Sequence, residues 1–169
     1  IMGQEGEGWQ VAMATLMFER GNVGGQAGGI SMMDLNVNDV LELARRSTRN
    51  GRPVLEDPLI RDQMVQFLIE AKSNSLMSAK GRIPALNSER PGAIAMSGKL
   101  RGTELKRRFC QFALSLQGAN GGRFIAPAAV DGGKWQRIYF NSFSATIGGG
   151  TTQVQYNIMG ERVLGLPKS

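Results

Sequence analysis

The chain has 169 residues, a length typical of one domain. Hydrophobic residues make up 41% and charged residues 20%, which suffices for a packed core and argues against wholesale disorder. Twenty Lys and Arg against fourteen Asp and Glu give a formal net charge of +6. The single cysteine and the absence of histidine exclude an internal disulfide, a cysteine zinc cluster and a Ser-His or Cys-His catalytic pair. A general base must therefore be a carboxylate, a lysine or a tyrosine, and we expect no metal site.

The beginning of the chain is polar and rich in glycine. Ile1 stands in place of an initiator methionine, and residues 3–8 contain no basic, apolar and small-residue signal sequence. The sequence also has no apolar run near the ~18 residues that a membrane span needs. We expect a cytoplasmic bacterial protein of which this chain is one piece.

Apolar spacing predicts two helices in the first third of the chain. The first covers residues 8–20, with a glycine-rich loop at 21–29. The second follows a cap at Asn36 or Asn38 and ends at Arg46. Its expected buried residues are Val40, Leu41 and Ala44. Residues 50–53, Asn-Gly-Arg-Pro, predict a turn.

The remaining pattern is also helical. Asp57 and Pro58 predict the start of a helix that continues to about Lys80, and residues 81–92 are expected to be irregular. A helix over 99–116 has its apolar positions at Leu105, Phe109, Phe112 and Leu116. Residues 118–133 predict a loop, and 135–143 fit either a helix or a strand. A last helix begins at Thr151, uses Val154, Ile158, Met159 and Val163, and stops at Gly165. The fold class expected is all-α, an up-and-down bundle of four to six helices.

Three features have both a functional and a plain structural interpretation. The turn at Gly148-Gly149-Gly150-Thr151 can present N–H groups to an anion or a polarised oxygen, or be a flexible turn with a threonine cap. Basic residues within 99–108 can face a phosphate or form a solvated helix face. Glu19 beside Arg20 is ordinarily a surface ion pair.

Read as strings, several segments resemble one family. Residues 149–167 read G-G-T-T-Q-V-Q-Y-N-I-M-G-E-R-V-L-G-L-P, which closely resembles the last helix of the acyl-CoA dehydrogenases, G-G-T-x-E-I-Q-x-N-I-I-A-E-R-V-L-G-L-P. Segments 8–20, 57–67, 99–104 and 116–121 are similar, in the same order, to the other helices and the L-G-G-N-G turn of that family's C-terminal domain. The resemblance implies that residues 1–169 form the C-terminal helical bundle of a longer enzyme. The family's N-terminal helical domain and middle β-domain then lie outside this chain.

The resemblance also implies a reaction and a base. Acyl-CoA dehydrogenases remove the α-proton of an acyl-CoA with a carboxylate while a β-hydride passes to N5 of FAD. Many members carry the base where this chain has Gly149. The isovaleryl type carries it on the first helix of the domain in an L-x-x-E-R string, which Leu16 to Arg20 matches. Glu19 is therefore the expected catalytic residue.

Other matched positions imply ligand contacts. Positions expected to bind FAD are Gln63, Thr151 and Gln153, together with the turn that the family places against the adenosine end from a neighbouring subunit. That turn matches Ser115, Gly118 and Ala119. A small shift of the family's arginine motif lets either Arg46 or Arg49 reach the pyrophosphate, and we assign Arg49. Positions expected on the acyl-CoA side are Phe18, Arg20, Gly149 and Gly150.

The family further implies partners: an acyl-CoA substrate, electron-transfer flavoprotein as acceptor, and a homodimer or homotetramer. Three alternatives stay open. The chain can belong to a non-catalytic subunit of a heteromeric dehydrogenase, which fits Gly149 at the base position. It can also belong to the family's DNA-associated branch, although we expect no nucleic-acid partner, or to a flavin oxidase that uses other substrates.

Overall fold

A computed structural model describes residues 3–23, 37–86, 92–125 and 127–167, with the side chains of 17–23 and 92–96 outside the description. Helices account for nearly all of its regular structure, so the prediction of an all-α bundle is confirmed. They are α1 (Gly8–Val23), α2 (Val37–Arg46), α3 (Pro58–Gly81), α4 (Gly92–Leu116), α5 (Lys134–Ile147) and α6 (Thr152–Ile158). A π-helical turn, Met159–Leu164, continues α6. Short 3-10 turns cover Val54–Glu56, Pro84–Leu86, Gly118–Gly122 and Val130–Gly133.

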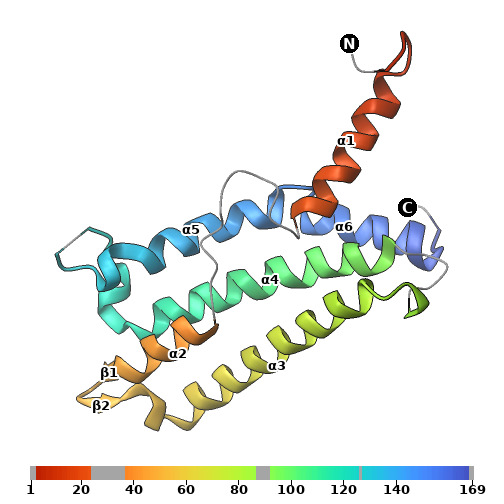
Figure 1. Cartoon of the computed structure of the whole chain (residues 1–169). Coiled ribbons are helices and arrows are strands. Elements are labelled where there is room, and N and C mark those ends of the chain that lie inside the picture. Colours follow the sequence, from red (N-terminus) through yellow and green to blue (C-terminus); the bar gives the residue numbers. More distant parts are fainter. Residues whose placement is uncertain (1–2, 24–36, 87–91, 126, 168–169) are drawn as a thin grey trace.

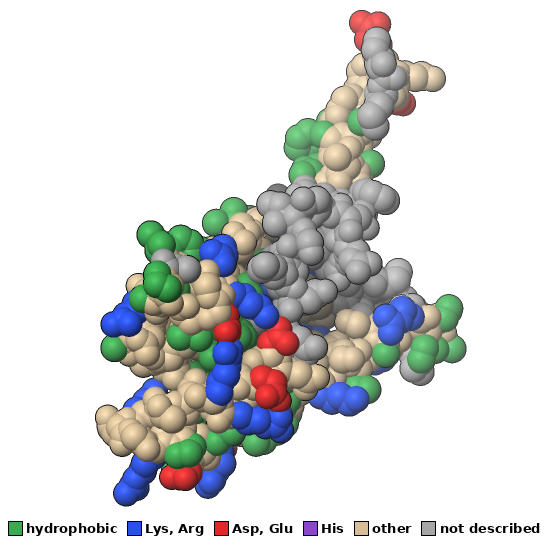
Figure 2. Space-filling model, turned by 60° about the vertical axis from the view of Figure 1, so that its left-hand side comes forward, with side chains coloured by type: hydrophobic (Ala, Val, Ile, Leu, Met, Phe, Trp, Pro, Cys, Tyr) green, Lys and Arg blue, Asp and Glu red, His purple; other side chains and the backbone are tan. Residues whose placement is uncertain are grey.

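The helices α3, α4 and α5 run up, down and up, with α4 in the middle (Figure 1). α2 packs across the C-terminal end of α4, and α6 continues in the direction of α5 along the N-terminal half of α4. α1 contacts α4, while its N-terminal end projects away from the bundle in both Figure 1 and Figure 2. This projection leaves Trp9 75% exposed. α4 is thus the helix against which the other helices pack.

The core lies around the C-terminal half of α4. Phe67 of α3 packs against Phe109 and Phe112, with ring centroids 5.0 and 5.3 Å apart. Leu116 and the indole of Trp135 extend this cluster toward α2 and α5. The four apolar positions predicted at 105, 109, 112 and 116 are all buried. Burial of each large side chain contributes about 1.5–3 kcal/mol, so this cluster is the main source of bundle stability.

Local sequence signals explain several boundaries. The Asp57 carboxylate accepts a hydrogen bond from Leu59 N at 2.9 Å, and Pro58 occupies the first turn of α3, as predicted. Asn50 and Gly51 have φ of +53° and +75°. The predicted turn therefore connects the two short strands of a hairpin, β1 (Thr48–Arg49) and β2 (Arg52–Pro53). Gly165, with φ of +72°, ends the last helical segment as predicted.

Some predicted details are wrong. In α2 the buried residues are Val40, Leu43 and Ala44, because Leu41 lies one position off the stripe that faces α4. In α6 the predicted apolar position Val154 is exposed, and the neighbouring Gln155 is buried instead.

Other boundaries also differ from the sequence prediction. α1 extends to Val23, so residues 21–23 of the predicted loop at 21–29 are helical, and residues 24–29 lie outside the described part. α4 begins at Gly92 instead of 99. The predicted loop at 118–133 contains two 3-10 turns. The ambiguous segment 135–143 is helical.

Candidate functional site

The glycine turn joins α5 to α6 at the N-terminal half of α4. Gly149 and Gly150 have φ of +66° and +101°, which side-chain-bearing residues rarely adopt. The Thr151 hydroxyl then accepts a hydrogen bond from Val154 N at 3.3 Å and caps α6. The threonine cap predicted from the sequence is therefore present. The left-handed φ of two of these glycines lets the chain pass from α5 into α6 through a conformation that residues with side chains rarely adopt.

Two neighbouring helices contact this turn through polar groups. Lys99 Nζ of α4 donates to the Gly150 carbonyl oxygen, and Gln155 Nε2 of α6 donates to the Gly149 carbonyl oxygen at 2.8 Å. One turn further along α4, Glu104 Oε1 accepts from the Thr152 hydroxyl at 2.8 Å. Lys99 is only 5% exposed, so it does not belong to the solvated helix face that the sequence suggested as one interpretation.

Among the described residues, the Glu104 carboxylate lies next to this turn. The hydrogen bond from Thr152 and the ion pair with Arg107 hold the pKa of Glu104 below its ordinary 4.5. A group whose charged form is stabilised in this way is a poor acceptor for a weakly acidic carbon-bound proton. Its role here is to anchor Thr152.

The expected base, Glu19, lies in the last two turns of α1. The helix that carries it contacts α4. The side chains of Phe18, Glu19 and Arg20 are outside the described part of the chain, so the structure gives their backbone only. Cys110 is no alternative nucleophile, since burial raises the pKa of its thiol to about 11.

The residues matched to the flavin divide between the two ends of α4. Thr151 and the exposed Gln153 lie at its N-terminal half, beside the glycine turn. At the other end, Arg49 of the hairpin donates from Nη2 to the Ser115 carbonyl oxygen at 3.1 Å. At about 1.5 Å per residue, Lys99 and Ser115 lie about 24 Å apart along the axis of α4.

The remaining matched positions lie toward that second end. Gly118 and Ala119 are exposed in the 3-10 turn that follows α4, and Gly118 has φ of +57°. Gln63 is exposed near the N-terminal end of α3. Arg46 forms a bidentate ion pair with Asp131, including a bond of 2.8 Å, whereas the exposed Arg49 keeps most of its donors. The tertiary structure therefore favours Arg49 over Arg46 as an anion contact.

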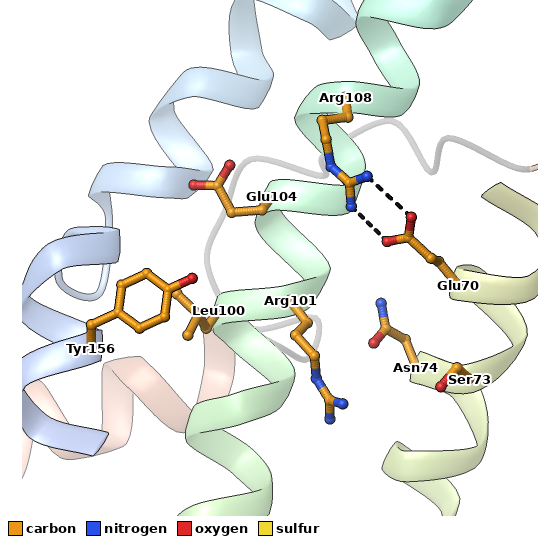
Figure 3. A pocket seen from close by; sticks show the side chains of 8 residues that line it. All are labelled: Glu70, Ser73, Asn74, Leu100, Arg101, Glu104, Arg108 and Tyr156. Atoms are coloured by element: carbon orange, nitrogen blue, oxygen red, sulfur yellow. Dashed lines mark hydrogen bonds and ion pairs between the residues drawn. The ribbon is translucent and has the colours of Figure 1, made fainter. Parts of the chain in front are cut away.

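The sequence reasoning missed a pocket between α3, α4 and α6, shown in Figure 3. Its volume is about 270 Å³. It is lined by Glu70, Ser73, Asn74, Leu100, Arg101, Glu104, Arg108 and Tyr156. The bidentate pair between Arg108 and Glu70 closes one side, with bonds of 3.1 and 2.5 Å. Among the positions matched to FAD or acyl-CoA whose side chains the structure describes, none lines this pocket. The basic run at 99–108 was the available signal for it.

Within the described ranges, no helix is long and apolar enough to cross a membrane. Over the same residues, no group of three or more His, Cys, Asp or Glu side chains is placed to hold a metal ion.

Comparison with known proteins agrees with the family resemblance of the sequence motifs. Residues 6–164 match the family model described as acyl-CoA dehydrogenase, C-terminal domain. The chain belongs to this family. Acyl-CoA dehydrogenase IpdE1 of Mycolicibacterium smegmatis is 34% identical over 177 residues, and the protein of the same name from Mycobacterium tuberculosis is 35% identical over 173. Each match covers 99% of this chain, which spans about two fifths of those relatives, 39% and 40%.

Solved structures show the same bundle. The complex described as Tcur3481-Tcur3483 steroid ACAD has a TM-score of 0.75 and 29% identity, covering 99% of this chain and 42% of the matched one. The ChsE4-ChsE5 complex from Mycobacterium tuberculosis has a TM-score of 0.72 and 24% identity over the same shares, which supports the fold alone.

Proposed function

We propose that this chain is the C-terminal FAD- and acyl-CoA-binding bundle of a longer acyl-CoA dehydrogenase. The whole enzyme removes one hydrogen each from the α and β carbons of an acyl-CoA. Two further domains, an N-terminal helical domain and a middle β-domain, complete it, which agrees with the chain spanning about two fifths of the length of IpdE1. The observation that carries this proposal is the match of residues 6–164 to the family model. The glycine turn held against α4 supports it, because Gly149 is the residue that the resemblance aligns with the family's base position.

The described residues fit a flavin nucleotide. An exposed guanidinium, Arg49, lies beside the end of α4 and is suited to phosphate. A Cβ added at Gly118 would meet nothing within 4 Å, so the backbone there is open to a close ligand. At the other end, Gln153 offers an exposed amide next to Thr151. FAD, when bound, supplies the hydride acceptor.

In this proposal the chain's own residues handle the α-proton. Glu19 takes that proton on a carboxylate oxygen. Because the proton is weakly acidic, the site must also stabilise the negative charge that develops on the thioester oxygen. The N–H of Gly149 donates to that oxygen. Glu104, the carboxylate described near the turn, has a lowered pKa, which supports assigning the base to α1.

The division of the matched positions supports an oligomer. The two groups lie about 24 Å apart along α4, and the family places its adenosine contact on a neighbouring subunit. We therefore propose a homodimer or homotetramer in which one copy supplies Thr151 and Gln153 and another supplies Arg49, Ser115 and the 118–119 turn. Electron-transfer flavoprotein is the proposed electron acceptor.

We favour a bulky acyl group as substrate. A similar solved complex is described as a steroid ACAD. Gly149 is buried and has no side chain, so the acyl group can approach the turn where other members carry a glutamate. This substrate class agrees with transfer of the base to Glu19 on the separate helix α1.

A non-catalytic subunit of a heteromeric dehydrogenase is the second candidate. Two observations favour it: the residue aligned with the base position is Gly149, and a similar solved structure is described by two components, Tcur3481-Tcur3483. A DNA-associated role has less support. On the face drawn in Figure 2, Lys and Arg side chains are interspersed with Asp and Glu. Several basic residues also form ion pairs with Asp or Glu: Arg45, Arg46, Arg107, Arg108 and Lys134.

The test uses the full-length, FAD-loaded enzyme with Glu19→Gln beside wild type and an exposed control, Glu5→Gln. Each protein is mixed anaerobically with a panel of straight-chain, branched and steroid-side-chain acyl-CoAs, and flavin bleaching is followed. Wild type and control should bleach with at least one substrate, and Glu19→Gln about 10²–10⁴-fold more slowly. Bleaching by wild type and Glu19→Gln at equal rates would remove Glu19 as the base. FAD-loaded wild type that never bleaches supports the partner-subunit alternative.

A further inference from the structure

Two buried side chains from different helices converge on the glycine turn. Lys99 is 5% exposed and Gln155 is 2% exposed, and each donates a hydrogen bond to a carbonyl oxygen of the turn. Withdrawing an ammonium group and an amide from water is unfavourable unless both are well paired. Apolar side chains of similar volume would fill the same space at lower desolvation cost. The polar pairing therefore calls for an explanation beyond filling the space between α4 and α6.

The two hydrogen bonds control how the peptide planes of the turn are rotated. Apolar packing restricts where a peptide lies, whereas a hydrogen bond to its carbonyl oxygen also restricts its orientation. In a trans peptide the following N–H points opposite to the carbonyl. Holding the Gly149 oxygen against Gln155 therefore directs the Gly150 N–H away from Gln155, and holding the Gly150 oxygen against Lys99 directs the Thr151 N–H away from Lys99.

The rest of the turn is anchored on both sides of this clamp. Gly148 N donates to the Ser144 carbonyl oxygen at 2.8 Å, and the Thr152 hydroxyl donates to Glu104 at 2.8 Å. The Gly149 N–H thus lies between one anchored peptide and two clamped ones. A Cβ added at Gly150 would lie 2.8 Å from Gln155 Nε2, so the clamp also requires glycine there.

We infer that Lys99 and Gln155 are positioning residues that hold the Gly149–Gly150 turn in the orientation needed to polarise the acyl-CoA thioester. The inference rests on the proposed function, in which the Gly149 N–H donates to the thioester oxygen. Without the clamp the two glycines gain access to many backbone conformations, because neither has a side chain to restrict it. The N–H is then correctly directed in only a fraction of molecules, which slows turnover more than it weakens substrate binding.

The test uses full-length, FAD-loaded enzyme with Lys99→Met, Lys99→Arg, Gln155→Leu and the double variant Lys99→Met/Gln155→Leu. Lys72→Met is the matched control, because Lys72 lies exposed on α3. The first readout is hydrogen–deuterium exchange of the peptide covering residues 146–152, without acyl-CoA. The second is kcat and KM for the acyl-CoA that bleaches wild type fastest. Thermal midpoints identify variants that do not fold.

We expect exchange in 146–152 to speed up about tenfold in Lys99→Met and Gln155→Leu, with kcat falling about tenfold or more and KM changing less than threefold. Lys99→Arg, which keeps a cationic donor, should recover part of the kcat. The double variant should lose less than the product of the two single losses, because both side chains act on one turn. The Lys72→Met control should match wild type in both readouts.

Unchanged exchange, or a lower thermal midpoint with wild-type kcat, would overturn the inference and leave both residues a packing role. If wild type oxidises no acyl-CoA, the proposed function fails on its own. The exchange readout then still decides whether Lys99 and Gln155 order the turn. Should Lys99→Met not fold, Gln155→Leu carries the same comparison, because it retains the charged group.

Discussion

The two halves of α4 differ in what they bury. The C-terminal half places Phe109 and Phe112 against Phe67 of α3, and the side chains that it adds to the hydrophobic core are apolar. The N-terminal half buries Lys99 and Thr103 and meets α6 through hydrogen bonds to a glycine turn. One helix thus has an end that holds the bundle together and an end that orients backbone groups.

Apolar and polar contacts make different contributions to the protein. Apolar burial contributes in proportion to area and tolerates small shifts, whereas a buried polar contact contributes about 1 kcal/mol net and depends on geometry. A polar end is therefore a weak means of stabilising a bundle. It is a good means of fixing the direction of a peptide. Substitutions at the two ends should consequently change different measured quantities.

The largest effect on stability is expected for Phe109→Ala. Truncating a buried phenylalanine in the aromatic cluster should lower the free energy of unfolding by about 3–5 kcal/mol. Denaturant titration of the full-length protein measures it, and flavin bleaching per folded molecule should change little. Phe140→Ala on α5 is the control, since Phe140 is 60% exposed, and its loss should be clearly smaller. Equal losses for the two variants would contradict the assignment of the core.

Gly150→Ala sharpens the contrast at the polar end. At φ of +101° a side chain is strained, and its Cβ would press on Gln155, so we expect a loss of about 1–3 kcal/mol together with a lower kcat. Gly102→Ala, inside α4 with nothing within 4 Å of the added Cβ, should instead gain about 0.5–1 kcal/mol. Thermal or denaturant unfolding gives both signs. A gain at Gly150 would mean that the turn is free to relax.

Asp131→Asn tests an ion pair beside the apolar end. The bidentate bond from Arg46, followed by that from the Trp135 indole at 2.6 Å, holds the pKa of Asp131 below its ordinary 3.8. A lowered pKa means that the stabilisation is complete above about pH 5 and is lost as pH falls through the folded-state value. We expect about 1 kcal/mol at pH 7, because Arg46 is half exposed.

Unfolding measured at several pH values should show the difference between Asp131→Asn and wild type shrinking below about pH 4. Asparagine tolerates the positive φ of +50° at this position, which limits the backbone contribution. A difference that does not depend on pH would point to packing around Trp135 instead of charge.

The smallest effect is expected for Arg108→Met. Its pair with Glu70 is bidentate, but the two side chains are 46% and 41% exposed, so solvent screens the interaction. The free energy of unfolding should change by less than about 1 kcal/mol. Raising the salt concentration should reduce the difference further, and a loss that salt does not change would point to the contact between the Arg108 guanidinium and the Phe67 ring, which methionine cannot replace.

The sequence predicted much of the secondary structure because its signals are local. Asp57 and Pro58 begin α3, and the spacing of 105, 109, 112 and 116 predicts the buried face of α4, as observed. Periodicity was misleading in α6, where it favours Val154 although Gln155 is buried. An amide can be buried when it has a carbonyl partner, and only the fold supplies that partner.

For the candidate site, too, some features could be predicted from the sequence and others could not. The motif at 149–167 and the L-x-x-E-R string indicate the family and the candidate residues from the sequence alone. That Arg49 meets Ser115, and that Arg46 is taken by Asp131, depends on elements more than sixty residues apart in the chain. Charge patterns along one helix carry no information on such partners.

The amino-acid sequence therefore predicted every described helix except α5, most of the helix ends, the family, and the lack of a carboxylate at Gly149. Those features depend on backbone preferences, capping and strings of neighbouring residues. The burial of Lys99, the contact of Gln155 with the turn, and the location at opposite ends of α4 of the positions matched to FAD are visible only in the folded chain. The reason is physical: whether a polar side chain can be buried depends on its hydrogen-bond partner, and that partner comes from a distant part of the chain.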